Sequence, residues 1–423
     1  MSKALAGLLV ALMLGVGLAV GVVAGGLIAG TDSTPPPVAV ASASTVPTPS
    51  PTAATSEAPP PSEPASAPPA TPSVEPSPSL APSPTPEPSP SLVPAPLTGR
   101  LVSPAVASRH VVAVMIDDQF DARPQSGLSS ASVVWQAPAE GGIPRYMALF
   151  QEGSPKAVGP VRSSRFYFVA WASEWKSVYV HVGGSPQALA FLHSSKGRGG
   201  AVFDADGFRY EGRYLWRINT RFAPHNVYSD AKNLRTMARA VQAKPVDYKP
   251  AWRFAPDKAL AERPKGGTIV VPYLANTITY KYDRKTNTYL RSVSGEKKQT
   301  DQASDKRIAP KNVVIMVVSF APLNDGSHKH RLEAQFTGEG TAWIASNGKT
   351  VKGTWRKKSM TSPTRFYGRD GKQVTMTVGQ TFIQVIPKGF RPTIKDGKVP
   401  PPPPPPAPPP ASGSKGSAGP LMQ

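Results

Sequence analysis

The chain has 423 residues, with 48 lysines and arginines against 27 acidic residues, and it contains no cysteine. Disulfides, thiolate zinc sites, cysteine nucleophiles and a lipidated cysteine are therefore excluded. The net charge of +21 favours anionic partners but does not define a fold. Of the 51 prolines, 22 lie at 31–96 and 11 from Pro400 onward, which leaves a globular region at about 97–395.

The N-terminus carries a long uncharged segment. Ala4 to Gly30 contains 27 residues without a charge, preceded by a single cation, Lys3. A helix needs about 20 residues to cross a bilayer, whereas the apolar region of a cleaved signal peptide has only about 7–15. We therefore predict an uncleaved transmembrane signal-anchor at 1–30. Because Lys3 stays inside, the rest of the chain is placed on the extracytoplasmic side of the cell membrane.

Two proline-rich segments flank the globular region. Residues 31–96 repeat Pro, Ser, Thr, Ala and Glu and contain few large apolar side chains. Such a segment cannot bury enough surface to offset the entropy of folding. We predict a disordered Pro/Ser/Thr-rich stalk at 31–96 and a disordered Pro-rich tail at 396–423.

The first half of the globular region, 97–244, is predicted to be a mixed α/β domain. Its continuous apolar run, which ends in Asp117 and Asp118, is typical of a buried strand. The two strands on either side of Gly141-Gly142 are expected to form a hairpin. The expected strands are 111–116, 132–137, 145–151 and 177–182. The expected helices are 187–193, which begins at a Ser-Pro pair, and one that Ser229 caps.

The second half, 265–395, follows a proline-spaced connector at 245–264 and is predicted to be a small antiparallel β domain. Its clearest signal is the alternation at 341–355 on either side of Asn347-Gly348, a favoured two-residue hairpin turn. A second hairpin is expected around Asp370-Gly371, and 381–386 also alternates. The predicted fold is therefore α+β, with an N-terminal transmembrane helix, a stalk, a mixed domain and a β-rich domain.

Short motifs rich in glycine, proline and arginine recur through the globular region. They are 122–128, 140–145, 159–165, 181–186 and 224–226 in the first half, and 338–340, 353–355 and 379–381 in the second. Together they resemble the YerB-like lipoproteins of bacteria over nearly all of 97–395. The resemblance implies a membrane-attached, extracytoplasmic protein with two paired domains, and it implies no reaction. The chain departs from the family in lacking the lipidated cysteine, which is consistent with a helix in place of the lipid.

Three arginines, Arg145, Arg162 and Arg165, are the candidate ligand-binding residues. Arg162 and Arg165 are three positions apart and share a face if Arg162 opens a helix that Ser163 or Ser164 caps. A helix N-terminus with two guanidiniums suits phosphate or pyrophosphate. The alternative is a pair of solvated arginines at the start of a helix.

The turn Gly183-Gly184-Ser185 is a second candidate anion site. Its glycines allow close backbone approach, and the dipole of the following helix attracts negative charge. A plain strand-to-helix turn explains the same residues equally well. Two such turns at one sheet edge would favour a ligand site, because open α/β sheets bind ligands there.

Further polar residues are candidates for supporting roles: Arg123, Asp117, Glu140, His181 and His225. Glu140 is expected either to pair with Arg145 across the hairpin or to orient the arginines around a ligand. Each histidine is a candidate general base, although a lone histidine is more often structural. No cofactor or metal is predicted, since the calcium-like start at Asp204 lacks a glutamate at the twelfth position.

Three functions stay open, and the first is favoured. The chain is a module that binds an anionic envelope component (peptidoglycan, a wall polymer or a lipid phosphate) through the arginines. Alternatively, it is an assembly protein whose β domain docks on another envelope protein, or an enzyme acting on a lipid-linked phosphate or wall polymer. Nucleic acid is not an expected partner, because the predicted location is extracytoplasmic.

Geometry distinguishes these functions. An enzyme should place Asp117, Asp118, Glu140 or His181 within reach of the arginines in one pocket. An assembly protein should instead expose an apolar patch, with Trp343 or Trp355 at its centre. A pure binding module should show the arginine pocket without an acid or base.

Overall fold

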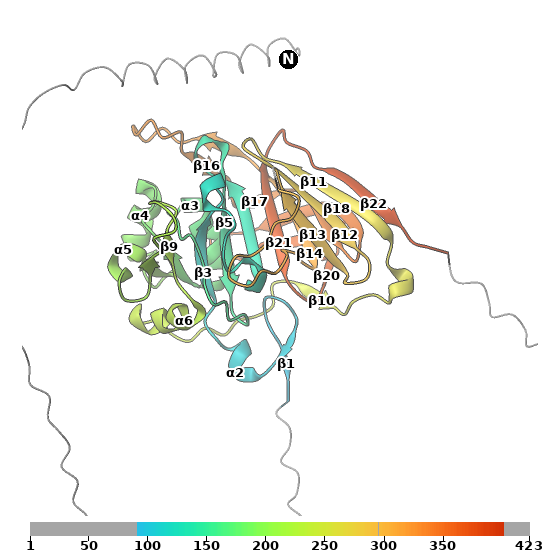
Figure 1. The fold of residues 1–423 in the computed structure, drawn as a ribbon, viewed down its shortest axis with the longest axis horizontal. Helices are drawn as coiled ribbons and strands as arrows, with labels where there is room; N and C mark the ends of the chain where they lie inside the picture. The colour runs from blue at the N-terminus through green and yellow to red at the C-terminus, as the bar shows by residue number, and fades with distance from the viewer. Residues whose placement is uncertain (1–90, 295, 402–423) are drawn as a thin grey trace, which may run out of the picture. The chain divides into compact units, whose positions relative to one another are not determined.

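The computed structural model describes residues 91–294 and 296–401 (Figure 1). The predicted signal-anchor at 1–30 lies outside these residues, as do nearly all of the predicted stalk and most of the predicted tail. Among the residues that the structure describes, no helix combines the length and hydrophobicity needed to span a membrane.

Strands dominate the described residues, and the helices are few and short. The helices are α2 (Pro104–Ala107), α3 (Phe166–Ala172), α4 (Pro186–His193), α5 (Gly207–Tyr210) and α6 (Ala231–Ala240). The strands of the first half are β1 (Val93–Pro94), β2 (Leu101–Val102), β3 (Val112–Asp117), β4 (Val133–Pro138), β5 (Pro144–Phe150), β6 (Val178–His181), β7 (Phe203–Asp206), β8 (Trp216–Arg217) and β9 (Val227–Tyr228). The strands that follow are β10 (Arg253–Ala255), β11 (Lys265–Pro272), β12 (Thr277–Asp283), β13 (Thr288–Val293), β14 (Asn312–Val318), β15 (Phe320–Pro322), β16 (Leu332–Ala334), β17 (Gly338–Ser346), β18 (Lys349–Lys357), β19 (Arg365–Tyr367), β20 (Thr375–Thr377), β21 (Thr381–Pro387) and β22 (Thr393–Lys398).

Ten strands form one mixed sheet, in the order β19-β18-β17-β14-β21-β4-β5-β3-β6-β7 (Figure 1). The sheet takes strands from both halves of the globular region, and the two sets meet where β21 pairs with β4. That pair is parallel, with Ile383 opposite Trp135. β14 and β21 also pair in parallel. The expectation of a purely antiparallel second half is therefore wrong.

The reason lies in the burial of these two strands. Six of the seven residues of β14 are buried, and Val317 is the exception. In β21, the residues from Thr381 to Ile386 are buried. Strands covered on both faces are continuous apolar runs, and such runs suit parallel pairing in the middle of a sheet. The alternation predicted at 381–386 does not correspond to a solvent-exposed face, because Thr381 and Gln384 are also buried.

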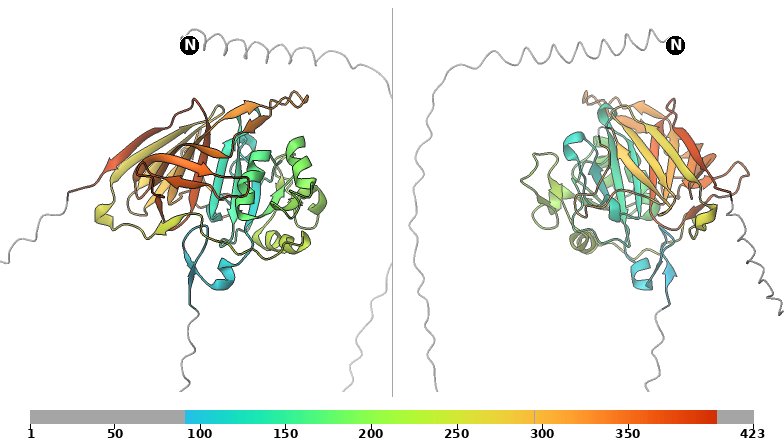
Figure 2. Two further views of the ribbon diagram at one scale, coloured as in Figure 1. Left: turned by 180° about the vertical axis from the view of Figure 1, so that it is seen from behind. Right: turned by 45° about the vertical axis from the view of Figure 1, so that its right-hand side comes forward.

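A second sheet has four antiparallel strands in the order β13-β12-β11-β22. It packs on one face of the large sheet: Ile269 and Val271 of β11 share an apolar cluster with Val313 and Ile315 of β14. Figure 2 shows these strands as a layer beside the large sheet.

Helices cover both faces of the first half of the large sheet. On one face, Phe168 and Trp171 of α3 pack in the same core as Trp135 of β4, and the two indole rings stack at 4.8 Å. On the opposite face, Leu234 and Met237 of α6 pack against a second core that lines β3 and β5. The helix predicted after Ser229 is present, but its cap is Asp230, whose carboxylate accepts the Asn233 N–H at 2.8 Å. Ser229 instead forms a bridge with Val158 and is buried.

Local signals predicted the hairpins well. β4 and β5 pair antiparallel around the turn at 140–142, as expected. β17 and β18 pair around Asn347-Gly348, and both turn residues have positive φ, at 51° and 71°. The hairpin expected around Asp370-Gly371 is irregular: β19 pairs with β18, whereas β20 pairs in parallel with β10.

Three predicted boundaries fall inside ordered structure. β1 lies within the predicted stalk, and the predicted tail boundary at 396 falls within β22. The predicted connector at 245–264 contains β10 and the buried side chain of Trp252, whose Nε1 donates to the Thr364 carbonyl at 2.9 Å. The prolines of these segments lie mostly in irregular stretches between ordered elements, and Pro94 lies in the two-stranded β1–β2 sheet, where an edge position tolerates it.

Six strands of the large sheet run in the same direction: β3, β4, β6, β7, β14 and β21. Their carboxyl ends therefore share one edge of the sheet, which we call the carboxyl edge. The β15–β16 hairpin extends from this edge, whereas β1 and α2 lie at the opposite one (Figures 1 and 2).

Candidate functional site

A cleft of about 500 Å³ opens at the carboxyl edge of the sheet. Its cationic lining residues are Arg145, Arg162, Arg165, Lys329 and Arg331, and its acidic ones are Asp117 and Glu140. The cleft therefore carries an excess of positive charge. The structure brings the three candidate arginines together in this one cleft. Open α/β sheets bind ligands at the carboxyl ends of their strands.

Glu140 holds two of the arginines in place. Its carboxylate pairs with Arg145 (Nη2 to Oε2, 3.1 Å) and accepts a hydrogen bond from Nη2 of Arg165. Arg145 also donates to the Ser163 carbonyl at 3.0 Å, and Arg165 to the Ser164 carbonyl. Both arginines are largely buried. The pairing of Glu140 with Arg145 and the gathering of arginines around Glu140, posed as alternatives from sequence, occur together.

Burial and these contacts shift the pKa values of the cluster. Burial by itself would raise the pKa of Glu140, but the charges of Arg145 and Arg165 outweigh it and hold that pKa below its ordinary value. Burial and repulsion from Arg145 lower the pKa of Arg165 to about 10, although Glu140 opposes this change. Both partners therefore stay ionised at neutral pH.

Arg162 belongs to a different set of contacts. Its Nε lies 2.9 Å from Oδ2 of Asp117, the last residue of β3. The same oxygen accepts a hydrogen bond from Nδ1 of His225 at 2.7 Å, and the other accepts the Gln119 N–H at 3.1 Å. Asp117 thus orients both a cation and an imidazole at the carboxyl edge.

The segment before α3 differs from the predicted helix start. Arg162 lies outside any helix, and its N–H donates to the Met115 carbonyl, while α3 begins only at Phe166. Ser163 and Ser164 do not cap this helix; Ser164 instead bridges Gly184 and bonds Tyr179 at 2.8 Å. The seven-residue helix provides no capped N-terminal anion site, so the side chains supply the cationic character of the cleft.

The Gly183-Gly184-Ser185 turn is satisfied within the protein. The Gly183 N–H donates to Oδ1 of Asp206 at 3.0 Å, so an internal carboxylate already occupies the proposed cradle. Ser185 Oγ caps α4 by accepting the Ala188 N–H at 3.3 Å. Of the three residues, only Gly184 lines the cleft.

The remaining candidates lie behind the cleft. His181 is fully buried, and its ring nitrogens contact Asp204 and the Gly183 carbonyl, each at 2.8 Å, which is a structural arrangement. Asp118 is also fully buried, and its carboxylate accepts from Gln136 at 2.5 Å. Burial raises the pKa of Asp118, despite the opposing charges of Arg123 and Arg291. Arg123 pairs with Asp118 at 3.4 Å.

Two cationic residues of the cleft were missed from sequence, Lys329 and Arg331. They come from the loop between β15 and β16, which the parallel strands β14 and β21 bring to the same edge as β4. Arg331 pairs with Asp325 and lies 3.8 Å from Oε1 of Glu140, whereas Lys329 is exposed. In sequence this loop is a basic turn like many others, and nothing local connects it to residues about 170 positions earlier.

Several polar atoms around the cleft are buried without a hydrogen-bond partner among the described residues. They are Nε of Arg162, Nε of Arg165, Nε of Arg331 and Oε2 of Glu140. Ion pairs contact three of these atoms: Nε of Arg162 lies 2.9 Å from Asp117, Oε2 of Glu140 lies 3.1 Å from Arg145, and Nε of Arg331 lies 3.8 Å from Glu140. Nε of Arg165 is the remaining atom, with neither a hydrogen bond nor an ion pair among the described residues, and water or a polar ligand would satisfy it.

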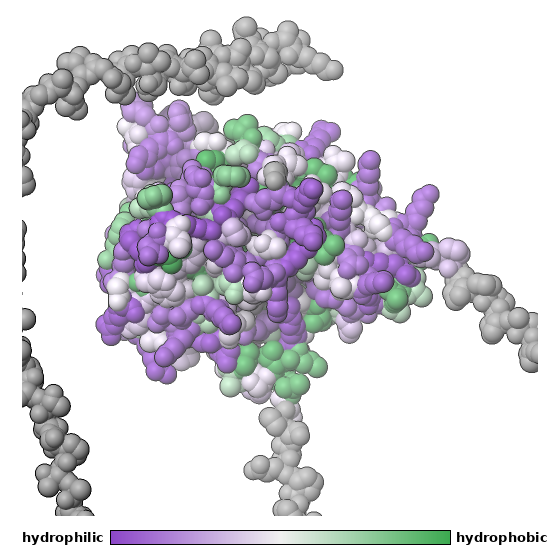
Figure 3. Space-filling view, in the orientation of Figure 1, coloured by the Kyte–Doolittle hydropathy of each residue, from purple (hydrophilic) through white to green (hydrophobic). Residues whose placement is uncertain are grey.

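The apolar patch expected for a docking protein is not centred where the sequence indicated. Trp355 is buried, and its Nε1 donates to the Val317 carbonyl at 2.9 Å. Trp343 is only partly exposed and packs against the cluster that joins the two sheets. Figure 3 shows a largely hydrophilic face with separate hydrophobic patches.

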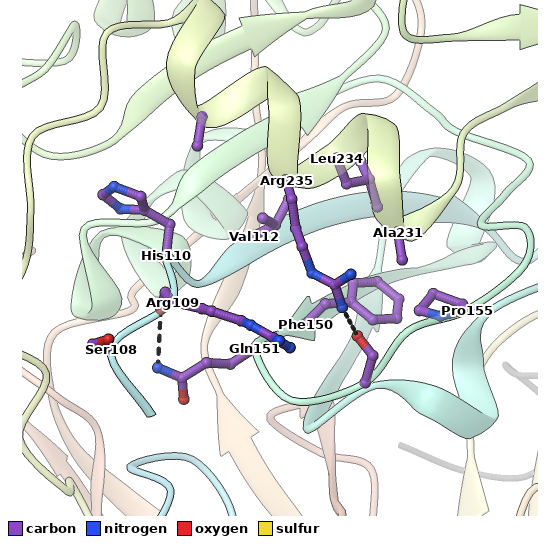
Figure 4. A pocket seen from close by; sticks show the side chains of 12 residues that line it. Ser108, Arg109, His110, Val112, Phe150, Gln151, Pro155, Ala231, Leu234 and Arg235 are labelled. Carbon is purple, nitrogen blue, oxygen red and sulfur yellow. Dashed lines mark hydrogen bonds between the residues drawn. The ribbon is translucent and has the colours of Figure 1, made fainter. Parts of the chain in front are cut away.

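A second pocket, of about 220 Å³, lies at the opposite edge of the sheet (Figure 4). Phe150 and Leu234 line it, and the side chains of Arg109 and Arg235 reach into it. Arg235 donates to the Gly153 carbonyl at 3.0 Å. None of the site residues predicted from the sequence lines this pocket, so it is separate from the arginine cleft.

Comparison with known proteins identifies the two halves. Residues 97–244 match the family model "Protein of unknown function (DUF3048) N-terminal domain", and residues 269–383 match the corresponding C-terminal domain. The chain is 31% identical over 299 residues to "Putative lipoprotein YerB" of Bacillus subtilis (strain 168). The aligned residues make up 69% of this chain and 85% of the relative.

A solved structure supports the same relationship. The crystal structure of YerB protein from Bacillus subtilis matches with a TM-score of 0.64 and 29% sequence identity. The match covers 72% of this chain and all of the solved one. With both domain models matched in order, the chain belongs to the DUF3048 family of paired N- and C-terminal domains of unknown function, and it is similar to YerB.

Proposed function

We propose that this chain is a membrane-attached, extracytoplasmic protein that binds an anionic component of the cell envelope in the arginine cleft. The observation that carries the proposal is the convergence of five cationic side chains, from segments up to 186 positions apart, on one cleft at the carboxyl edge of the sheet. The partner is a phosphate- or carboxylate-bearing molecule, such as peptidoglycan, a wall polymer or a lipid phosphate.

The contacts within the cleft support binding rather than mere solvation. Glu140 fixes Arg145 and Arg165, so these groups need little reorganisation when a ligand arrives. Arg162 and Lys329 are more accessible and are the cations best placed to meet the ligand. Guanidiniums held in a fixed geometry suit bidentate contacts to carboxylate or phosphate.

The membrane attachment rests on two sequence features and one relative. The segment 4–30 is long enough to span a bilayer, and the chain has no cysteine for lipid attachment. The relative YerB carries the word lipoprotein in its name. A signal-anchor helix at 1–30 would attach this chain to the membrane, with the globular region outside the cytoplasm.

Binding by the cleft can be measured with full-length protein in lipid nanodiscs. We would titrate it with native sacculi and, separately, with vesicles that contain polyprenyl phosphate, over a range of salt concentrations. The informative variant is Arg162→Gln/Lys329→Gln, because Arg145 and Arg165 are buried and their loss would also affect folding. We expect this variant to bind at least about tenfold more weakly, since two ligand-facing charges are removed.

The matched control is Lys358→Gln/Lys372→Gln, which removes the same charge from two exposed lysines outside the cleft. Equal weakening in both variants would mean that diffuse charge alone is responsible. Absence of salt-sensitive binding to either probe would contradict the proposal.

One observation favours an enzyme as the second candidate. The hydrogen bond from Nδ1 of His225 to Asp117 fixes the tautomer, and Nε2 of His225 makes no hydrogen bond to the described residues. A carboxylate-oriented imidazole beside Arg162 has the arrangement of a general base next to an anion-binding group. If the chain is an enzyme, His225→Gln should abolish turnover of a bound polyprenyl phosphate substrate while leaving its affinity within about twofold.

A further inference from the structure

The four most exposed large apolar side chains of the described residues lie beside the arginine cleft. Of nine exposed large hydrophobic residues, the four most exposed are Phe222 at 91%, Leu274 at 76%, Phe120 at 71% and Phe208 at 69%. We call these four residues the apolar rim. Phenylalanine is usually buried, so three such exposed rings in one part of a surface indicate an interaction site.

Contacts place each rim residue beside the cleft. The ring of Phe208 lies over Gly183, so close that a side chain at this glycine would meet it. The next residue, Gly184, lines the cleft. Leu274 packs against Gly142, in the same turn as Glu140.

The other two rim residues adjoin the Asp117 side of the cleft. Phe120 directly follows Gln119, a lining residue whose N–H donates to Asp117. The backbone N–H of His225 donates to the Phe222 carbonyl at 2.9 Å. The ring of His225 in turn contacts Asp117, which lines the cleft. The rim therefore belongs to the same edge as the cleft.

We infer that this edge docks on the surface of a bilayer containing anionic lipid, with a lipid headgroup in the arginine cleft and the rim among the acyl chains. The inference rests on the proposed function and names the class of anion as a lipid. Aromatic side chains inserted at the headgroup boundary, beside cations that meet anionic headgroups, are the two elements of peripheral membrane binding. Arg209 and Lys329, both exposed, provide further cations at this edge.

A soluble wall polymer would explain the cleft but not the rim. A sugar ring can stack on one aromatic face but has little apolar surface to cover Leu274 as well, whereas acyl chains can remove all four apolar side chains from water. A protein partner would account for the rim but does not require an open, positively charged cleft at its centre. Lipid is the one occupant that matches both parts.

The length of the chain permits this orientation. The first described strand, β1, lies at the edge of the large sheet opposite the carboxyl edge (Figures 1 and 2). Between the predicted anchor and the described residues lie positions 31–90, whose extended length is at most roughly 190 Å. That reach allows the carboxyl edge to turn toward the membrane that holds the anchor.

Fluorescence quenching tests this inference. The chain has no cysteine, so a single introduced cysteine provides a single site for attaching a fluorophore. Ala275→Cys, beside Leu274, places a fluorophore at the rim, and Ala105→Cys places it on α2 at the opposite edge; both positions are exposed. Full-length labelled protein is inserted in phosphatidylcholine vesicles with or without about 30% phosphatidylglycerol, a typical anionic lipid content for such a test. Quenching by a nitroxide lipid within the bilayer then reports contact.

We expect quenching at position 275 to be at least about threefold that at position 105, and to depend on phosphatidylglycerol. Phe208→Ser/Phe222→Ser should remove this difference. The matched control is Leu92→Ser/Leu101→Ser, which removes exposed apolar groups near β1 and should change nothing. Equal quenching of both labels, or unaltered quenching in the rim variant, would overturn the inference.

A soluble headgroup separates this inference from the function on which it rests. Glycerol phosphate has the anionic group and no acyl chain, so Arg162→Gln/Lys329→Gln should weaken its binding about tenfold and the rim variant should not affect it. If the cleft binds glycerol phosphate while position 275 stays unquenched, the anion-binding function stands and the lipid inference is wrong. If neither signal is found, both fail.

Discussion

Glu140 is the acid around which the buried arginines of the cleft are arranged. Arg145 and Arg165 are largely buried, and removing Glu140 leaves them without their main counter-charge. The resulting loss in free energy of unfolding is larger than that from breaking a single surface ion pair. Its role in the fold and its role in the site cannot be separated, because the same ion pairs that stabilise the turn at 140–142 hold the guanidiniums toward the cleft.

We expect Glu140→Gln to reduce the free energy of unfolding at neutral pH by about 3 kcal/mol. Because the pKa of Glu140 is below its ordinary value in the folded protein, its stabilising contribution is present above that ordinary value. The contribution is lost as the pH falls through the lowered pKa. The difference between wild type and variant should therefore shrink on acidification, as measured by denaturant unfolding at several pH values.

The control for this experiment is Glu333→Gln, at an exposed position with no ion pair among the described residues. It should stay within about 0.5 kcal/mol of wild type. A pH-independent difference in Glu140→Gln would show that the ionised carboxylate is not what stabilises the cluster.

Sequence reasoning identified five of the seven charged residues of the cleft, for a physical reason. Arg145, Arg162 and Arg165 stand next to glycine- and proline-containing turns at strand ends, and Glu140 stands in one of those turns, so local pattern was sufficient. Lys329 and Arg331 could not be found in this way. Their position depends on the register of β14 and β21, which is set by contacts across the whole chain.

At the scale of the element, hairpins are specified locally and parallel pairs are not. The turn at Asn347-Gly348 fixes the register of β17 and β18 through its backbone conformation, and the sequence predicts it correctly. β14 and β21 have no connecting turn that specifies their pairing, because a parallel pair needs a long crossover. The sequence shows only that they are apolar, and their neighbours must come from the structure.

Two glycines in β-turns provide a test of this local specification. Gly348 has φ of 71°, and a Cβ there would overlap Tyr282 and Pro264. Gly371 has φ of 74° and no atoms near the same point. We expect Gly371→Ala to cost about 1 kcal/mol for the left-handed backbone alone. Gly348→Ala should cost about 3 kcal/mol, because it adds the steric conflict.

Thermal or denaturant unfolding of the two variants, compared with wild type, gives both values. Equal losses would indicate that Tyr282 and Pro264 move aside without cost. A smaller loss at Gly348 than at Gly371 would contradict the packing described for this turn.

At the scale of the molecule, buried polar contacts join the two halves. Lys357 of β18 and Glu174, which follows α3, form an ion pair of 3.0 Å with both side chains inaccessible to solvent. Glu174 also accepts hydrogen bonds from the backbone and hydroxyl of Thr364. Burial lowers the pKa of Lys357, while Glu174 opposes this change. The pair therefore depends on both halves being folded together.

We expect Lys357→Met and Glu174→Gln each to destabilise the protein by about 3–5 kcal/mol, since each leaves a buried group without its partner. The double variant should cost less than the sum of the two, by at least about 2 kcal/mol. Chemical denaturation should show one transition for wild type and all variants. Additive losses would mean that the two side chains do not interact in solution.

The pairing of β21 with β4 has a consequence for how the protein is made. Synthesis reaches β4 at residue 138, but its parallel partner does not exist until residue 387 has been added. For that interval the six apolar-rich residues of β4 form a bare edge, which is a template for strands of other chains. Contacts of such long sequence separation also form slowly. The nascent chain therefore exposes this edge to neighbouring chains until its own C-terminal part is made and completes the sheet.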